Sequence, residues 1–204
     1  MLDHIAYAAP DLEAAVAGLE MRLGVRAAAG GKHRGLGTHN ALLSLGEGVY
    51  FEIIAPDPDQ PAPSQPRPFG LDDGGPPRLA AWCAKAPDID ERVARARAAG
   101  YDPGGVLALG RDRPDGTSVT WRFTFPTGAG DGLVPFLIDW GDSPHPSLDA
   151  PRGCTLVSLR GEHPRPQAVV PLLKALEVEL DVAPGPAPAL VLLLDTPNGQ
   201  VELR

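Results

Sequence analysis

The sequence predicts an α+β fold built from short β-α-β-β-β units, and three observations lead to this prediction. First, two segments are similar to each other, since each has a strand-like apolar run, the tripeptide Ala-Pro-Asp, an alanine-rich amphipathic stretch and a glycine. Second, short apolar or alternating runs typical of strands follow each segment. Third, 24 glycines and 24 prolines in 204 residues provide frequent turn signals and leave little room for long helices.

The first unit covers residues 1–57. Its helix is predicted to begin after Asp11, whose side chain can accept hydrogen bonds from free backbone N–H groups, and to end at Gly24, which can adopt a left-handed conformation. Apolar residues recur at helical spacing between them and predict one buried stripe: Leu12, Ala15, Val16, Leu19 and Leu23. A strand is predicted before the helix, and further strands in NALLSLG and VYFEIIAPD after it.

Two further units follow the first. Residues 79–141 are predicted to repeat it, with Asp88 as helix cap, Gly100 at the helix end and strands in VTWRFTFP and LVPFLIDWG. Residues 147–204 form a looser third copy, in which Pro171 is expected in the first turn of the helix. We therefore predict one domain over residues 1–146 and an extension over 147–204. The Pro-rich segment 58–78 is expected to run over the surface as an extended linker.

Composition and charge exclude several classes of protein. The net charge is −8, and the basic residues form no cluster of the kind that nucleic-acid binding needs. Cys83 and Cys154 form no C-x-x-C pair, so neither a disulfide framework nor a thiolate zinc site is expected, which fits a reducing cytoplasm. No signal peptide is recognisable, and the apolar run PALVLLLDTP is too short to cross a membrane as a helix. We expect a cytoplasmic protein whose partner is a small molecule, not nucleic acid or membrane.

Several of these segments resemble a known family. The run LDHIAYAAPDLEAAV…LG, followed by GTHNALLSLG…YFEIIAPDP and RPDGTSVTWRFTFP…LVPFLIDWGDSPHP, resembles a glyoxalase-like domain of the vicinal oxygen chelate superfamily over residues 1–146. The resemblance implies paired β-α-β-β-β modules whose curved mixed sheets enclose a cavity. It also implies a divalent metal held by residues on the first and last strand of each module.

Strand alternation places two polar side chains together. In LDHIAYA, His4 is predicted on the face opposite to Asp3 and Ile5, and in VYFEIIAPD, Glu52 is predicted on the face opposite to Phe51. The apolar residues suit the helix-covered face, so His4 and Glu52 are expected to share the cavity. The resemblance makes them the catalytic and metal-binding pair, and an imidazole with a carboxylate suits Zn, Ni, Fe or Mn.

The second module departs from the family pattern. The positions expected to match His4 and Glu52 hold Ala81 and Phe136, which cannot bind a metal. A complete site would need help from one of three other residues: His39, Asp139 or Glu202. Without such help, His4 and Glu52 are expected to form a buried hydrogen-bonded pair in a site that binds metal weakly or not at all.

Further side chains are candidates for contact with a substrate: His39, Asn40, Trp82, Trp121, Arg122 and Asp139. Arg122 is expected to point into the cavity if the aromatic residues beside it pack under the helix, where it would need an anionic partner. Otherwise it lies exposed on the rim. His145, in a Pro-bounded loop, is expected to be a turn or lid residue, and His163 is expected at the surface.

Three functions remain open at this level. The leading hypothesis is an enzyme that acts on a small oxygenated metabolite by metal-assisted isomerase, lyase or dioxygenase chemistry, with Glu52 as ligand or base. The second is a non-catalytic binding protein similar to bleomycin-resistance members of the family, because tryptophans are available to line a cleft. The third is a module that forms a homodimer through an open sheet edge. The abundance of Gly, Ala, Pro and Arg suggests a bacterial source.

Overall fold

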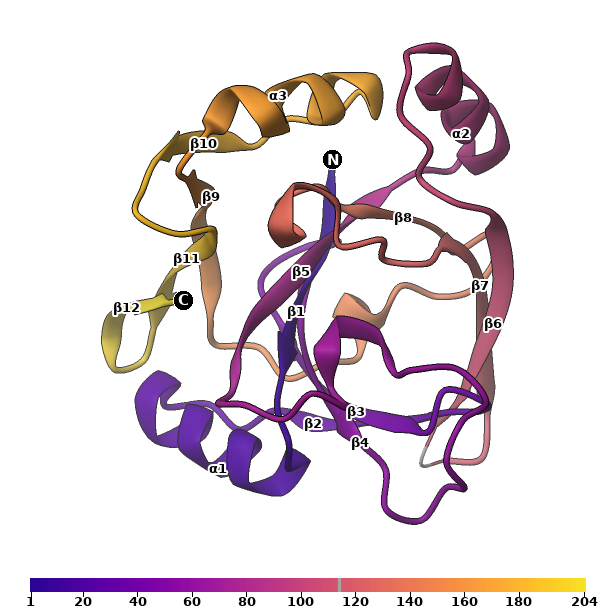
Figure 1. Cartoon of the computed structure of the whole chain (residues 1–204). Helices are drawn as coiled ribbons and strands as arrows, with labels where there is room; N and C mark the ends of the chain where they lie inside the picture. The colour runs from indigo at the N-terminus through magenta and orange to yellow at the C-terminus, as the bar shows by residue number, and fades with distance from the viewer. Residues whose placement is uncertain (114) are drawn as a thin grey trace.

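Eight strands close into a barrel in a computed structural model, which describes residues 1–113 and 115–204 (Figure 1). Their order around the barrel is β1-β4-β3-β2-β6-β7-β8-β5. The sheet is mixed, because β1 pairs with β4 and β5 pairs with β8 in parallel, whereas the other neighbours are antiparallel. The barrel strands are β1 (Leu2–Ala8), β2 (Ala28–His33), β3 (Thr38–Ser44), β4 (Tyr50–Pro56), β5 (Arg78–Lys85), β6 (Val106–Asp112), β7 (Ser118–Thr124) and β8 (Phe136–Asp139).

A second sheet and three α-helices lie outside the barrel (Figure 1). The sheet has the order β10-β9-β11-β12. Its strands are β9 (Thr155–His163), β10 (Asp181–Pro184), β11 (Ala189–Thr196) and β12 (Gly199–Leu203). The helices are α1 (Leu12–Leu23), α2 (Ile89–Ala98) and α3 (Pro166–Ala175), and the 3-10 turns are η1 (Pro68–Gly70), η2 (Ala129–Gly132) and η3 (Pro146–Leu148). None of the helices in the described ranges has the length and apolar character of a membrane span.

Helix α1 forms as its end signals predict. The Asp11 side chain accepts a hydrogen bond from the backbone N–H of Ala14 at 2.8 Å, and Gly24 ends the helix with a φ of 73°. Asp88 differs from the prediction, because its side chain makes no capping hydrogen bond to α2. Its carboxylate instead forms ion pairs with Arg92 and Arg95 on the same helix.

The two aspartates therefore predict a measurable contrast in stability. Asp11→Ala is expected to lower the free energy of unfolding by about 1 kcal/mol, because a backbone N–H loses its acceptor at the helix start. Asp88→Ala removes only exposed ion pairs and is expected to lower it by no more than about 0.5 kcal/mol. Urea denaturation of the two variants measures both values. Equal losses would show that the Asp11 cap adds nothing beyond its charge.

One hydrophobic core joins the barrel to the second sheet. Outward-facing barrel residues such as Phe51 and Leu137 belong to the same buried cluster as Leu173 of α3 and Leu192 of β11. Trp82 also lies in this core, where its indole N–H donates to the carbonyl of Leu133 at 2.8 Å. The division of the chain into 1–146 and 147–204 stays a prediction.

One prediction about a proline is wrong, and the Pro-rich segment makes an inward contact that the sequence did not predict. Pro171 lies inside α3 rather than in its first turn, because the helix begins at Pro166 and buries Val169 and Leu173 against the core. The Pro-rich segment 58–78 is more than a surface linker. Its turn η1 holds Phe69 in a left-handed conformation with a φ of 62°, and Phe69 reaches the interior of the barrel.

Candidate functional site

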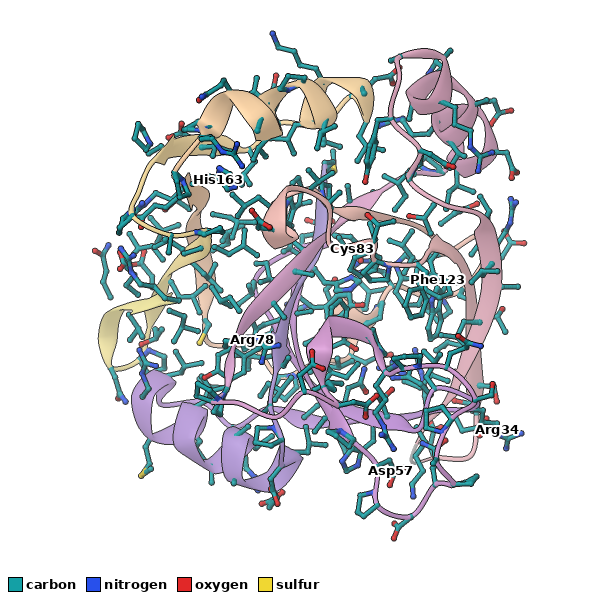
Figure 2. The ribbon with its side chains drawn as sticks, viewed as in Figure 1. Arg34, Asp57, Arg78, Cys83, Phe123 and His163 are labelled. Atoms are coloured by element: carbon teal, nitrogen blue, oxygen red, sulfur yellow. The ribbon has the colours of Figure 1, made fainter. Side chains whose placement is uncertain are left out.

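The barrel interior contains a cavity of about 60 Å³ with an aromatic wall and a polar end. The wall is formed by Tyr50, Phe69, Trp121, Phe123, Phe125, Phe136 and Trp140. The polar end is formed by His4, His33, Asn40, Glu52 and Arg111. Figure 2 shows Phe123 inside the ring of strands.

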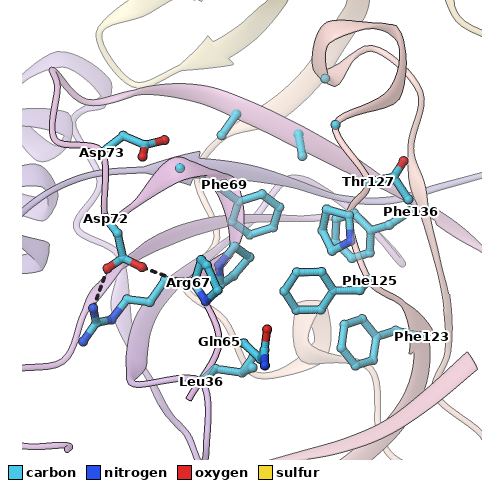
Figure 3. A pocket seen from close by; sticks show the side chains of 18 of the residues that line it. Leu36, Gln65, Arg67, Phe69, Asp72, Asp73, Phe123, Phe125, Thr127 and Phe136 are labelled. Carbon is cyan, nitrogen blue, oxygen red and sulfur yellow. Dashed lines mark hydrogen bonds and ion pairs between the residues drawn. The ribbon is translucent and has the colours of Figure 1, made fainter. Parts of the chain in front are cut away.

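A wider outer cleft of about 1070 Å³ adjoins this cavity and shares part of its aromatic wall. Figure 3 shows Phe69 and Phe136 facing Phe123 and Phe125 across the cleft. At its rim, the Arg67 guanidinium pairs with Asp72 at 2.5 Å. A ligand can therefore extend from the polar end, along the aromatic rings, toward this cleft.

His4 points into the cavity as alternation predicts, and an irregularity at the start of β1 brings Asp3 beside it. The pairing of β1 with β5 shifts register between Leu2 and His4. As a result, Asp3 lies against His4 instead of on the helix side where alternation predicted it, and the His4 Nδ1–H donates to Asp3 Oδ1 at 2.7 Å. The imidazole stacks on Tyr50, with ring centroids 4.6 Å apart, and its Nε2 lies 3.8 Å from Glu52 Oε2.

Asp3 is a fully buried acceptor for three different side chains. Besides His4, its carboxylate accepts from Trp140 Nε1 at 3.2 Å and from His145 Nε2 at 3.1 Å. Burial by itself would raise the pKa of Asp3, but the hydrogen bonds and charges of His145 and His4 outweigh it and hold that pKa well below its usual range. Asp3 is therefore ionised, and it fixes which ring nitrogen of His4 carries a proton.

Glu52 lies between two imidazoles and is held by an amide. The Asn40 side-chain N–H donates to Glu52 Oε1 at 2.5 Å, and the same oxygen lies 3.8 Å from His33 Nε2. Burial lowers the pKa of His33 to about 4, although Glu52 opposes this shift. His33 is therefore neutral at pH 7. Its Nδ1 bonds to Thr38 Oγ1 at 3.0 Å, and its Nε2 faces Asn40 at 3.4 Å.

Arg111 is the cation of the polar end. Its Nη1 donates to Asn40 Oδ1 at 3.2 Å, so Asn40 lies between the guanidinium and Glu52. Burial lowers the pKa of Arg111, and the charge of Glu52 partly offsets this effect. Arginine nevertheless stays protonated in proteins, so the cavity has one permanent positive charge.

Several predicted site residues lie elsewhere. His39 and Asp139 alternate with the inward-facing Asn40 and Ile138 and do not line the cavity, and Trp82 belongs to the core. The aromatic residues of β7 face the cavity, so Arg122 points outward and pairs with Asp90 of α2 at 2.7 Å. Asn40 and Trp121 do line the cavity.

Two residues outside the barrel also differ from expectation. Glu202 lies in the second sheet, where it pairs with Arg204 at 2.9 Å, so it cannot complete a site in the barrel. His163 is buried rather than on the surface, and its Nε2 pairs with Asp131 at 2.9 Å. Figure 2 shows His163 beside α3, away from the barrel interior.

The strand register identifies which residues of the second half match His4 and Glu52. In the parallel ladders, His4 pairs with Tyr50 and Cys83 pairs with Phe136. Each ladder ends in the same backbone contact, from Ala9 N–H to the Ile54 carbonyl in the first half and from Ala86 N–H to the Ile138 carbonyl in the second. Counted from these contacts, Phe136 matches Glu52 and Ala81 matches His4. These are the matches that the sequence predicted, and both residues face the barrel interior without a group that can bind a metal.

A divalent metal does not fit the donors as they are arranged. In the described part of the chain, one group of potential ligand atoms lies within 4.8 Å: Asp3, His4 and Cys83. Asp3 and His4 are joined there by a hydrogen bond. Burial, together with the charges of Asp3 and Glu52, raises the pKa of the Cys83 thiol well above its usual value. The thiolate that metals bind is therefore disfavoured. His4 and His33 approach different oxygens of Glu52 and form no such group with it. These donors act here as hydrogen-bonding groups.

The sequence analysis missed four residues of this network: Asp3, His33, Arg111 and His145. Alternation in β6 offered a signal for Arg111, since Leu109 and Arg111 share a face. No sequence signal identifies His145, because the chain fold brings it to Asp3 across 142 positions.

Comparisons with known proteins agree with this architecture. Residues 2–177 match the family model described as a glyoxalase-like domain, and the chain belongs to this family. This confirms the resemblance to the vicinal oxygen chelate superfamily. No curated protein matches the sequence.

Matches among solved structures include three bacterial proteins. A hypothetical protein from Staphylococcus aureus is 16% identical, with a TM-score of 0.65 over 98% of this chain and 83% of that chain. Methylmalonyl-CoA epimerase from Mycobacterium tuberculosis is 22% identical, with a TM-score of 0.46 over 69% of this chain and 87% of that chain. The hypothetical protein BH1468 from Bacillus halodurans C-125 is 16% identical, with a TM-score of 0.47 over 71% of this chain and 96% of that chain.

Proposed function

We propose that this chain is an enzyme that binds a small oxygenated molecule in the barrel and moves a proton on it, with Glu52 as the base. The observation that carries the proposal is the placement of Glu52. Its carboxylate is buried at the polar end of an aromatic cavity, held by Asn40 at 2.5 Å and flanked by His4 and His33 at 3.8 Å each. A positioned carboxylate in a water-poor cavity is suited to general base catalysis.

The proton transfer has a simple balance. The Glu52 carboxylate takes a proton from a carbon next to a carbonyl group, and the electron pair of the C–H bond becomes the C=C bond of an enolate, whose charge rests on oxygen. Because Asp3 accepts from His4 Nδ1–H, His4 Nε2 is the ring nitrogen that faces the cavity beside Glu52. Glu52 then returns the proton to carbon, which restores the carbonyl group and completes an isomerisation or exchange.

Proton exchange into deuterated water tests the proposal without knowledge of the natural substrate. We expect the protein to catalyse loss of the C3 protons of 4-phenyl-2-oxobutanoate in D2O, observed by NMR. Glu52→Gln is expected to slow this exchange by roughly 100-fold or more, because the amide cannot accept the proton. Glu91→Gln makes the same change on exposed α2 and serves as the control.

The second candidate function is non-catalytic binding of a small molecule. The second half of the barrel favours it, because Phe136 occupies the position equivalent to Glu52 and aromatic rings form most of the wall. Binding of 4-phenyl-2-oxobutanoate without exchange above the background rate would support this function and refute catalysis by Glu52. Elemental analysis of untreated protein adds a check, since about one ion per chain that is lost in His4→Ala would restore the metal-assisted mechanism.

Other features of the prediction remain proposals. We infer that residues 1–57, 79–141 and 147–204 are structural copies of one β-α-β-β-β unit, which superposition of the three segments tests. A cytoplasmic location, a bacterial source and a homodimer stay predictions.

A further inference from the structure

The most informative group that the proposed reaction does not use is the guanidinium of Arg111. Its side chain is 4% exposed and lines the cavity, yet it forms no ion pair with any carboxylate in the described part of the chain. Its Nε–H is buried without a hydrogen-bond partner. A buried cation without an anion costs free energy, and an unpaired donor adds to that cost. Such a group is typical of a site whose anion arrives with the ligand.

The backbone beneath Arg111 is shaped to hold this side chain in place. Gly30 and Gly31 of β2 lie against it, and a Cβ on Gly30 would come within 2.7 Å of Arg111 Nη1 and within 2.2 Å of Asn40 Oδ1. A Cβ on Gly31 would come within 2.8 Å of Arg111 Cγ. Glycine at both positions therefore leaves room for the guanidinium and for Asn40. At Gly31 the close approach of the Asp112 carbonyl and a positive φ of 146° also require glycine.

The surroundings of Arg111 favour a carboxylate with an apolar body. The planar guanidinium matches a carboxylate through two parallel hydrogen bonds. Asn40 separates it from Glu52, which reduces repulsion between Glu52 and an incoming anion. Beyond the polar end, the wall consists of aromatic rings that lead to the outer cleft.

We propose that Arg111 binds the carboxylate of the ligand, so that the ligand class is a small organic acid with an apolar or aromatic body. This inference rests on the proposed small-molecule site and specifies what that site recognises. The acid group lies at Arg111, and the body extends along Trp121 and Phe123 toward the cleft. Carbon atoms near the acid group then lie close to Glu52.

A matched pair of unreactive probes tests the proposal. Wild-type protein is expected to bind 4-phenylbutanoate at least roughly tenfold more tightly than 4-phenylbutanamide, which has the same body without the charge. Titrations followed by the fluorescence of Trp121 and Trp140 give both dissociation constants. In Arg111→Gln, the ratio of the two constants is expected to fall to about one. Using the ratio within each variant removes effects of general destabilisation.

Two further variants make the test specific. Arg113→Gln removes the same charge from a residue that lines a neighbouring surface cleft but not the cavity, and it is expected to keep the wild-type ratio. Arg111→Lys keeps the charge without the planar fork and is expected to give an intermediate ratio. Equal ratios in wild type and Arg111→Gln, an equal loss in Arg113→Gln, or no binding of either probe by wild type would overturn the proposal.

These outcomes are separable from those of the Glu52 experiment. Preference for the acid without proton exchange would leave Arg111 as the carboxylate site and remove catalysis. Exchange that is lost in Glu52→Gln but unchanged in Arg111→Gln would support catalysis by Glu52 and refute Arg111 as the carboxylate site.

Discussion

Replacement of Asp3 by alanine is expected to lower the free energy of unfolding by about 3–5 kcal/mol, because it breaks a buried charged network by removing its only acceptor. His4 Nδ1, Trp140 Nε1 and His145 Nε2 all donate to this carboxylate, and in the variant the buried His4 and the partly buried Trp140 and His145 would lose this acceptor. Urea denaturation at pH 7 measures the loss. Asp142→Ala, at an exposed position, is the control and is expected to change stability by less than about 0.5 kcal/mol.

The same network predicts a pH dependence. The pKa of Asp3 in the folded protein is held well below its usual range, whereas the unfolded chain has an ordinary carboxyl pKa of about 3.9. The contribution of Asp3 is therefore fully present above the unfolded pKa and is lost as pH falls toward the folded pKa. Wild type and Asp3→Ala should differ most in stability at neutral pH and converge below about pH 4. A difference that is constant from pH 7 to pH 3 would show that the carboxylate charge does not stabilise the fold.

Leu192→Ala is expected to lower the free energy of unfolding by about 2–5 kcal/mol, because it leaves a hole in the core that joins β11 to the barrel. Leu192 is fully buried, and it belongs to the same cluster as Phe51 and Leu137 of the barrel. Leu148→Ala, at a position that is 57% exposed, is the control and is expected to have little effect.

The unfolding curve of Leu192→Ala also tests the predicted division of the chain. If the barrel and the second sheet unfold as one unit, circular dichroism and tryptophan fluorescence should give the same transition in wild type and in the variant. The fluorescence reports on residues 1–146, since Trp121 and Trp140 line the cavity and Trp82 of β5 lies in the shared core. A variant whose circular dichroism changes first, with an unaltered fluorescence transition, would show that residues 147–204 unfold separately.

Local signals predicted the elements of this fold and one pair in its site. The Asp11 cap, the Gly24 exit and the apolar stripe between them depend on neighbours within a few residues, and all three occur as expected. Alternation in β4 also placed Glu52 opposite to Phe51, with Glu52 in the cavity. The family model over residues 2–177 agrees with the resemblance found in these segments.

The errors occurred where long-range packing overrides a local rule. Alternation cannot tell which face of a strand is covered, so it left open whether Arg122 points into the cavity or lies on the rim. In the structure the aromatic residues of β7 face the cavity and Arg122 points outward. A register shift at the start of β1 placed Asp3 beside His4. Phe69, in a segment expected to lie on the surface, is drawn inward because an aromatic ring gains free energy when it leaves water.

The sequence by itself determined the order of strands and helices and the presence of His4 and Glu52 on inward faces, because periodicity and capping act over a few residues. Only the tertiary structure decided what surrounds this pair. Closure of the barrel brings Asn40, Arg111 and His33 from three different strands to Glu52, and the loop after β8 brings His145 to Asp3. The physical reason is that buried polar groups must find partners wherever the chain places them, and those partners lie far away in sequence.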